Sequence, residues 1–161
     1  MKPYQMLKRV RIAMILCCSL LLAAAALAGT KSMAVVVSAG SKLADVPLAD
    51  LAKLCKGAQK TWSDGKNFTL VMKDPDSPEM HLVAQKLFGA GPGEAKATIT
   101  KLNEARLTVK IVDNDEDLLR TVEATPGAAG IIDVYSINSA VKVLRVDGKL
   151  PFDIGYALKG N

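Results

Sequence analysis

The sequence predicts an α/β domain with a mixed, mostly parallel β-sheet and helices on both of its faces. Two observations carry this prediction. Short apolar runs rich in β-branched residues alternate along the chain with stretches of helical apolar spacing, in the order β-α-β-α-α-β-α-β-β. The first run, residues 33–37, is apolar at every position, which is typical of a parallel strand buried on both faces.

The predicted strands are apolar runs bounded by turn-forming residues. The second run follows a polar turn that holds Trp62, and the last run alternates in polarity and leads into a tight turn at Asp147-Gly148. The predicted strands are residues 33–37, 68–72, 107–112, 128–132 and 141–146. Residues 38–45 are predicted as loop, and residues 149–161 as extended or irregular chain.

The predicted helices are recognised by their apolar spacing and their end signals. The first has Pro47 ahead of it and Gly57 at the position of a C-terminal stop. The last follows Asp113-Asn114-Asp115, residue types that favour a helix N-cap. The predicted helices are residues 48–56, 81–88, 94–102 and 116–124.

The first 28 residues are predicted to be a secretory signal peptide. Four cations and no acid stand at its start: Lys2, Lys8, Arg9 and Arg11. The apolar run that follows ends in Ala26-Leu27-Ala28, a small-x-small pattern that predicts cleavage after Ala28. Residues 29–161 then form a single exported domain, which we expect to be periplasmic or secreted.

An uncleaved membrane anchor is the alternative interpretation of the leader. The apolar run is about 17 residues long, at the short edge of what spans a bilayer, so cleavage is favoured. Either form exports the remainder, because the positive charges stay on the inner side. A lipoprotein attached through Cys17 or Cys18 ranks lower, because the bulky Leu16 precedes Cys17. Contact with a membrane is expected only through an uncleaved leader.

The net charge of +5 is largely a property of the leader. Without the four leader cations, 17 Lys and Arg residues remain against 16 acids, which leaves a net charge of +1. A domain so close to neutrality lacks the basic excess that nucleic-acid binding requires. We therefore expect no nucleic-acid partner.

The reactive residue types exclude several classes of function. Cys55 stands alone outside the leader and shares the apolar face of a helix, which indicates a small core residue. His81 is the single histidine, so no Cys/His cluster indicates a zinc site. No nucleotide-binding glycine motif and no nucleophile–base pair stands out, so we expect neither an enzyme nor a cofactor. The acidic residues 113–117 could collect a divalent cation, but a solvated helix cap is the favoured interpretation.

The stretch Lys73-Asp74-Pro75-Asp76-Ser77-Pro78 is the candidate binding site. It joins the predicted strand 68–72 to the predicted helix 81–88. A strand that turns directly into a helix start presents backbone N–H groups and the positive end of the helix dipole, which attract small anions. Lys73 adds a cation and Ser77 a hydroxyl.

An ordinary helix cap is the alternative explanation of this stretch. Ser77 is one candidate N-cap, with Pro78 at the first helical position. Asp76 is the other, with Glu79 three residues further on.

Six features, in fixed order, resemble one lobe of the PstS-like phosphate-binding proteins of ABC transporters, a branch of the periplasmic binding protein superfamily. The resemblance covers nearly all of the chain after the leader. The matching features are the strand 34–37 ahead of Pro47, the helix 48–57, Thr61-Trp62-Ser63-Asp64-Gly65, the strand leading to Ser77, the Pro126-Gly127-Ala128 turn within 122–131, and the segment 141–148.

The resemblance implies one lobe of a type II periplasmic-binding-protein-like fold. It also implies a non-enzymatic protein that binds inorganic phosphate or a similar oxyanion for ABC-type transport or for sensing. Lys73 and Ser77 are then the ligand-binding residues. Proteins of this type have two lobes, so a transporter or envelope protein, or a second copy of the chain, is expected as a partner.

The family's anion-binding turn resembles Arg-x-x-x-Ser-Gly-Thr, and this chain departs from it. Lys73 lacks the planar fork of arginine, Pro78 removes a backbone N–H donor, and Glu79 places a negative charge near the anion. These changes predict weak oxyanion binding. The alternative is an envelope structural or interaction module that kept the fold and lost ligand binding.

Overall fold

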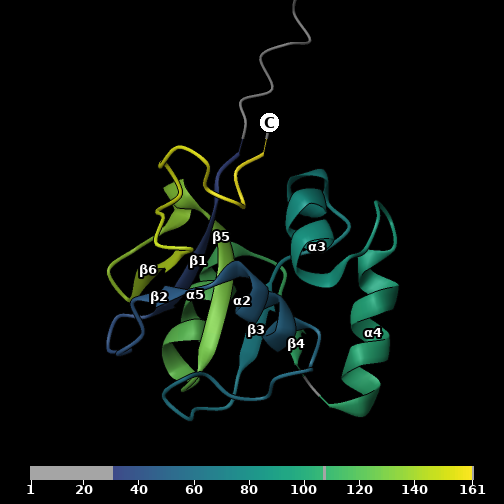
Figure 1. Ribbon diagram of the computed structural model, residues 1–161, viewed down its shortest axis with the longest axis horizontal. Coiled ribbons are helices and arrows are strands. Elements are labelled where there is room, and N and C mark those ends of the chain that lie inside the picture. The colour runs from purple at the N-terminus through teal and green to yellow at the C-terminus, as the bar shows by residue number, and fades with distance from the viewer. Residues whose placement is uncertain (1–30, 107, 161) are drawn as a thin grey trace, which may run out of the picture. The chain divides into compact units, whose positions relative to one another are not determined.

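The computed structural model describes residues 31–106 and 108–160 (Figure 1). The predicted signal peptide, residues 1–28, lies outside the described residues. Within the described residues, no helix is both long enough and apolar enough to cross a membrane.

Six strands and four α-helices follow one another closely along the described chain. The strands are β1 (Met33–Ser38), β2 (Asp45–Val46), β3 (Thr69–Met72), β4 (Val109–Ile111), β5 (Ala128–Asp133) and β6 (Val141–Val146). The helices are α2 (Leu48–Cys55), α3 (His81–Phe88), α4 (Ala95–Ala105) and α5 (Asp115–Ala124), with short 3₁₀ turns η2 (Pro78–Met80) and η3 (Val134–Ser136). The predicted order of elements is confirmed. The structure adds one short strand, β2, which begins at the last residue of the predicted loop 38–45.

All six strands belong to one sheet, in the order β2-β6-β1-β5-β3-β4. Strand β3 is parallel to β4 and to β5, and β2 is parallel to β6. The central strand β1 is antiparallel to both of its neighbours, β5 and β6. The predicted burial of residues 33–37 on both faces is confirmed, but their predicted parallel pairing is wrong. A continuous apolar run reports that both faces are covered and carries no information about the direction of the neighbouring strands.

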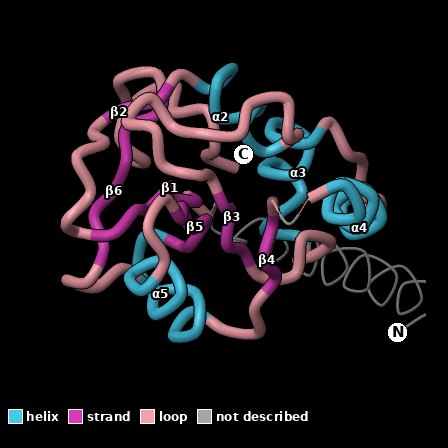
Figure 2. Tube along the Cα trace, turned by 90° about the horizontal axis from the view of Figure 1, so that it is seen from below, coloured by secondary structure: helices cyan, strands magenta, loops and turns pink. Residues whose placement is uncertain are grey.

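Helices cover both faces of the sheet, as predicted (Figures 1 and 2). On one face, Met33, Val35 and Val37 of β1 belong to a large apolar cluster with α2 and α3. On the other face, Ala34 and Val36 belong to a smaller cluster with α5. The two-residue period of the strand sends alternate side chains to opposite faces, so one short strand anchors both halves of the core.

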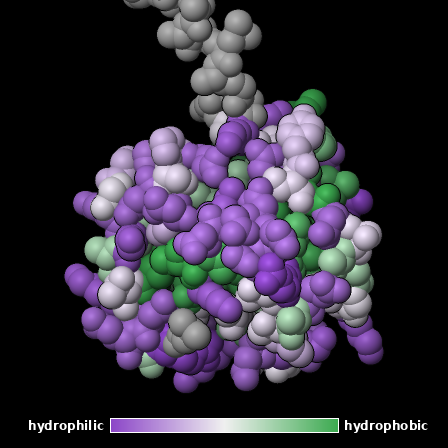
Figure 3. Space-filling model, turned by 180° about the vertical axis from the view of Figure 1, so that it is seen from behind, coloured by the Kyte–Doolittle hydropathy of each residue, from purple (hydrophilic) through white to green (hydrophobic). Residues whose placement is uncertain are grey.

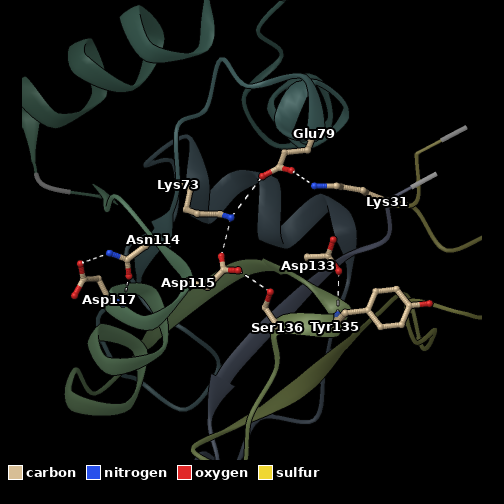
Figure 4. Close-up of polar contacts among 9 residues, drawn as sticks. All are labelled: Lys31, Lys73, Glu79, Asn114, Asp115, Asp117, Asp133, Tyr135 and Ser136. Carbon is tan, nitrogen blue, oxygen red and sulfur yellow. Dashed lines mark hydrogen bonds and ion pairs between the residues drawn. The ribbon is translucent and has the colours of Figure 1, made fainter. Parts of the chain in front are cut away.

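Parallel pairing positions the site-bearing loops. Because β3, β4 and β5 run in the same direction, the loops that follow them meet at one edge of the sheet. The start of β1 lies at the same edge, because β1 is antiparallel to β5. This edge therefore collects Lys31, Lys73, Asp115 and Ser136 from four separate parts of the chain (Figure 4).

The irregular tail predicted after residue 149 packs onto the domain. Tyr156 is buried, and its hydroxyl donates a hydrogen bond of 3.0 Å to the Met33 carbonyl. Burial raises the pKa of the Tyr156 hydroxyl. The tail ends beside the start of β1, where the Gly160 N–H donates to the Lys31 carbonyl at 3.2 Å.

The surface carries few large apolar side chains. Figure 3 shows one face of the molecule, on which hydrophilic residues predominate and apolar side chains show in limited areas. Among the described residues, the exposed large apolar side chains are Ile111, Tyr135, Phe152 and Ile154. Tyr135 and Phe152 contact each other, with ring centroids 6.3 Å apart.

We predict that Gly130→Ala destabilises the domain by about 1–3 kcal/mol, because extra volume in a packed core forces strain. A Cβ at this position would lie 2.7 Å from Leu118 Cδ2 and 2.9 Å from Val122 Cγ2, which are both in α5. Gly40→Ala is the matched control, because a Cβ there meets nothing within 4 Å. The measurement is urea unfolding. Equal midpoints for the two variants would contradict the close packing of β5 against α5.

Candidate functional site

Lys73 lies at the centre of a polar cluster at the sheet edge (Figure 4). It follows β3, and its ammonium is 2.7 Å from Asp115 Oδ1 and 3.6 Å from Glu79 Oε1. These contacts, led by the hydrogen bond to Asp115, raise the pKa of Lys73. The cation that the sequence predicted for the site is therefore already paired with two carboxylates.

Asp115 opens α5 and joins two other elements of the site. Its Oδ1 faces Lys73, and its Oδ2 accepts a hydrogen bond of 2.6 Å from the Ser136 hydroxyl. Partial burial works to raise the pKa of the Asp115 carboxyl, but Lys73 and Ser136 outweigh it, and the net pKa is lowered. Asp115 thus stays ionised at neutral pH and fixes Lys73 between β3 and α5.

Glu79 bridges two lysines from separate parts of the chain. Its Oε2 is 2.5 Å from Lys31 Nζ, and its Oε1 faces Lys73. The hydrogen bond from Lys31 is the main cause of the lowered pKa of the Glu79 carboxyl. The sequence placed Glu79 near the anion as a repelling charge, whereas the structure shows it bound to both cations.

Lys31 and Ser136 are residues of the cluster that sequence reasoning missed. Lys31 lies 48 residues before Glu79 in the chain, within a short polar segment that carries no motif. Only the antiparallel alignment of β1 against β5 brings it to the edge where Lys73 lies. No signal in the sequence marks Lys31 as a partner of Glu79.

Ser77 takes a different position from the one expected of an anion ligand. Its Oγ is buried and has no hydrogen-bond partner among the described residues. Ser77 precedes η2 and not α3, so the first turn of α3 begins four residues further along the chain. The predicted direct passage from a strand into an α-helix at Ser77 is therefore wrong, because a 3₁₀ turn intervenes.

Neither predicted N-cap of the helix 81–88 forms a side-chain cap. Ser77 stands at the N-cap of η2, with Pro78 in the first turn, but its hydroxyl makes no cap hydrogen bond. Asp76 Oδ1 instead accepts from the Ala95 N–H at 3.0 Å, at the first residue of α4. Asp76 therefore ties the candidate loop to α4, a contact between residues far apart in sequence that local capping rules do not reveal.

The acidic run 113–117 is a capped helix start, as favoured from the sequence. Asn114 Oδ1 accepts from the Asp117 N–H at 2.8 Å, and Asp115 pairs with Lys73. Within the part of the chain that the structure describes, no group of three or more His, Cys, Asp or Glu residues could hold a metal ion.

Trp62 and Cys55 are packing residues, as predicted. The Trp62 indole N–H donates to the Gly127 carbonyl at 2.8 Å, and its ring packs edge-on against Phe68. Cys55 is buried in α2, and burial raises the pKa of its thiol. Neither side chain is placed to contact a ligand at the cluster around Lys73.

The cluster is balanced in charge, with two lysines against two carboxylates: Lys31, Lys73, Glu79 and Asp115. Lysine ammonium groups at this edge can hold an oxyanion, because they are strong donors with a full positive charge. An external anion must compete with carboxylates that already occupy these donors. The arrangement therefore has the cations of an anion site, and the carboxylates that pair with them would lower its affinity for an external anion.

Comparisons with known proteins identify the fold. No family model and no curated protein matches the chain. It is similar to the solved structures of an ABC-type phosphate transport receptor from Vibrio cholerae (TM-score 0.63, 16% identity, 81% of this chain and 54% of that one) and PstS from Borrelia burgdorferi (TM-score 0.60, 16% identity, 82% and 55%). A phosphate-binding protein from Stenotrophomonas maltophilia also matches (TM-score 0.55, 16% identity, 76% and 40%).

The chain spans about half the length of these neighbours. The similarity covers most of this chain and only about half of each neighbour, which fits the single lobe that the sequence resemblance implies. The chain therefore has the fold of one lobe of a PstS-type phosphate-binding protein.

Proposed function

We propose that the protein is an exported, non-enzymatic domain that binds phosphate or a similar oxyanion weakly, in ABC-type transport or in sensing. The observation that carries the proposal is the pairing of two lysines, Lys31 and Lys73, with one carboxylate at the carboxyl-terminal edge of the sheet. This edge is where α/β folds bind ligands. The structural neighbours, named as phosphate-binding proteins, support phosphate as the first ligand to test.

A single lobe leaves a bound ligand open to solvent on one side. Small-molecule sites normally bury most of the ligand surface, and two-lobed binding proteins achieve this by hinged closure. A ligand on this lobe would need cover from outside the lobe, and a transporter component, another envelope protein or a second copy of the chain could supply it. Lys73 and Ser77 are the proposed ligand residues, and Ser77 requires a local shift, because its Oγ is buried.

The second candidate is an envelope interaction module that no longer binds a ligand. The observation that favours it is the mutual neutralisation of Lys73, Asp115 and Glu79, which leaves no unpaired cation in the cluster among the described residues. In this case the ion pairs serve stability, and the edge of the sheet contacts another protein. Light scattering with and without anion tests this candidate, because a strict monomer without a partner would count against it.

We predict saturable binding of phosphate, with sulfate and molybdate as comparison anions, and a dissociation constant on the order of a millimolar. Calorimetric titration of the purified exported protein measures it. Lys73→Met and Ser77→Ala should each weaken binding about ten-fold, because each removes a donor to the anion. Lys53→Met is the matched control, because Lys53 pairs with Asp50 on the exposed surface of α2. Absence of saturable binding at tens of millimolar anion, roughly ten times that constant, would favour the interaction module.

We predict that the cluster stabilises the fold at neutral pH and stops doing so in acid. The folded-state pKa values of Glu79 and Asp115 are lowered, so their contribution is present above the ordinary carboxyl range. It is lost as the pH falls below about 4. Because Glu79 is only partly buried, Glu79→Gln should cost about 1 kcal/mol at pH 7 and progressively less as the pH falls toward the lowered pKa of Glu79.

Urea unfolding at several pH values measures this effect, with Glu104→Gln in α4 as a control of equal charge change. Glu104 is exposed. A difference between the wild type and Glu79→Gln that stays constant from neutral pH to pH 3 would show that ionisation of Glu79 does not stabilise the fold.

A further inference from the structure

We propose that the Glu79 carboxylate is the resident anion of this site, and that an external oxyanion binds by displacing it from Lys31 and Lys73. This inference rests on the proposed oxyanion function and names its regulation and its ligand class. It assigns Lys31 to the binding site and gives Glu79 the role of an internal competitor.

The geometry of Glu79 is that of a bound anion. Its two oxygens contact two different lysines, Oε2 with Lys31 at 2.5 Å and Oε1 with Lys73 at 3.6 Å. Figure 4 shows both lysine side chains pointing toward this carboxylate from opposite sides. An oxyanion that bridged the same two ammonium groups would occupy the position of the Glu79 carboxylate.

The contacts of Glu79 are the ones that an incoming anion can replace most easily. The described residues give its carboxylate no hydrogen bond or ion pair other than those to the two lysines. Lys31 is 55% exposed, so solvent and ions reach this pair. Glu79 belongs to the three-residue 3₁₀ turn η2, whose Met80 is buried, so displacement has to move the Glu79 side chain and not the turn.

Lys73 stays in place when Glu79 leaves, because Asp115 holds it more closely. The Lys73–Asp115 distance is 2.7 Å, against 3.6 Å for Lys73–Glu79, and Ser136 in turn holds Asp115. Displacement therefore breaks the Lys31–Glu79 pair and the long Lys73–Glu79 contact, while the contacts among Lys73, Asp115 and Ser136 remain. The result is a site with one fixed cation, Lys73, and one adjustable cation, Lys31.

Charge selects the class of ligand. A monovalent anion that replaces one carboxylate brings no electrostatic gain over Glu79, whereas a divalent oxyanion brings a second charge to the same two lysines. We therefore expect hydrogenphosphate or sulfate to bind, and nitrate or chloride to compete poorly. An anion must therefore interact with the two lysines more strongly than the Glu79 carboxylate does in order to bind.

The test is titration of the purified protein with inorganic phosphate, sulfate and nitrate at constant ionic strength and neutral pH. Glu79→Gln removes the internal anion and should bind phosphate about ten-fold tighter or more, because Lys31 is left unpaired and Lys73 keeps only its pairing with Asp115. It should also bind nitrate more tightly than the wild type does, because nitrate no longer has to displace a carboxylate. Glu104→Gln changes the net charge equally on α4 and should bind as the wild type does. Glu79→Gln/Lys31→Met should lose most of the gain.

The outcomes separate the two proposals. Wild-type binding with no gain in Glu79→Gln overturns the displacement mechanism and leaves the oxyanion function standing. Binding by Glu79→Gln alone shows that Glu79 occupies the anion position and is not displaced from it, which overturns both the displacement mechanism and oxyanion binding as the native function. Binding by neither protein overturns both.

A second measurement uses the wild type alone, in case Glu79→Gln fails to fold. The titration of the Glu79 carboxyl carbon is followed by NMR with and without sulfate, whose charge is constant over the acid range. Displacement by sulfate removes the lysine contacts and should raise the lowered pKa of Glu79 toward its ordinary value. A titration that sulfate leaves unchanged overturns the mechanism.

Discussion

The parallel pairing of β3 with β4 and β5 is the constraint on which the site depends. It sends the loops after three strands to one edge of the sheet, and the antiparallel strand β1 adds its own start to the same edge. Residues far apart in the chain then meet there, among them Lys31, Lys73 and Asp115. The sheet itself is held by β1, whose alternate side chains anchor apolar clusters on both faces.

Two lysines that meet at a sheet edge repel each other, and carboxylates within the cluster offset this repulsion. The lysines also attract anions, and here Glu79 and Asp115 supply the counter-charges. The two carboxylates differ in role. Asp115 is tied to Ser136 and holds Lys73 to α5, while Glu79 reaches a largely exposed lysine from a short turn. Stability and the proposed oxyanion binding would therefore depend on the same cations.

The fold similarity to phosphate-binding proteins directs attention to the sheet edge that carries Lys73. Their folds cover most of this chain, while this chain covers about half of theirs. The sheet edge with Lys73 also carries Tyr135, an exposed aromatic side chain beside Ser136. Ligand coverage and protein contact would thus fall on the same surface, which is why anion titration and oligomeric state must be measured together.

The sequence alone predicted the order of strands and helices and the α/β class, because apolar periodicity and turn residues act locally. The single-lobe fold was expected from the resemblance of six ordered motifs to a known family. The sequence also predicted that Trp62 and Cys55 are packing residues and that 113–117 begins a capped helix. It identified Lys73 and the opposing charge of Glu79, because both stand in one contiguous motif.

Only the tertiary structure decided the direction of β1, the contact of Asp76 with α4, and the pairing of Lys31 with Glu79. Each of these joins residues far apart in the chain, and local patterns carry no record of such contacts. The same holds for the 3₁₀ turn at Pro78, whose side-chain signals are those of an α-helix start. Strand direction and ion pairing depend on how the whole sheet assembles. The pairing of the site lysines with carboxylates could therefore be seen only in the tertiary structure.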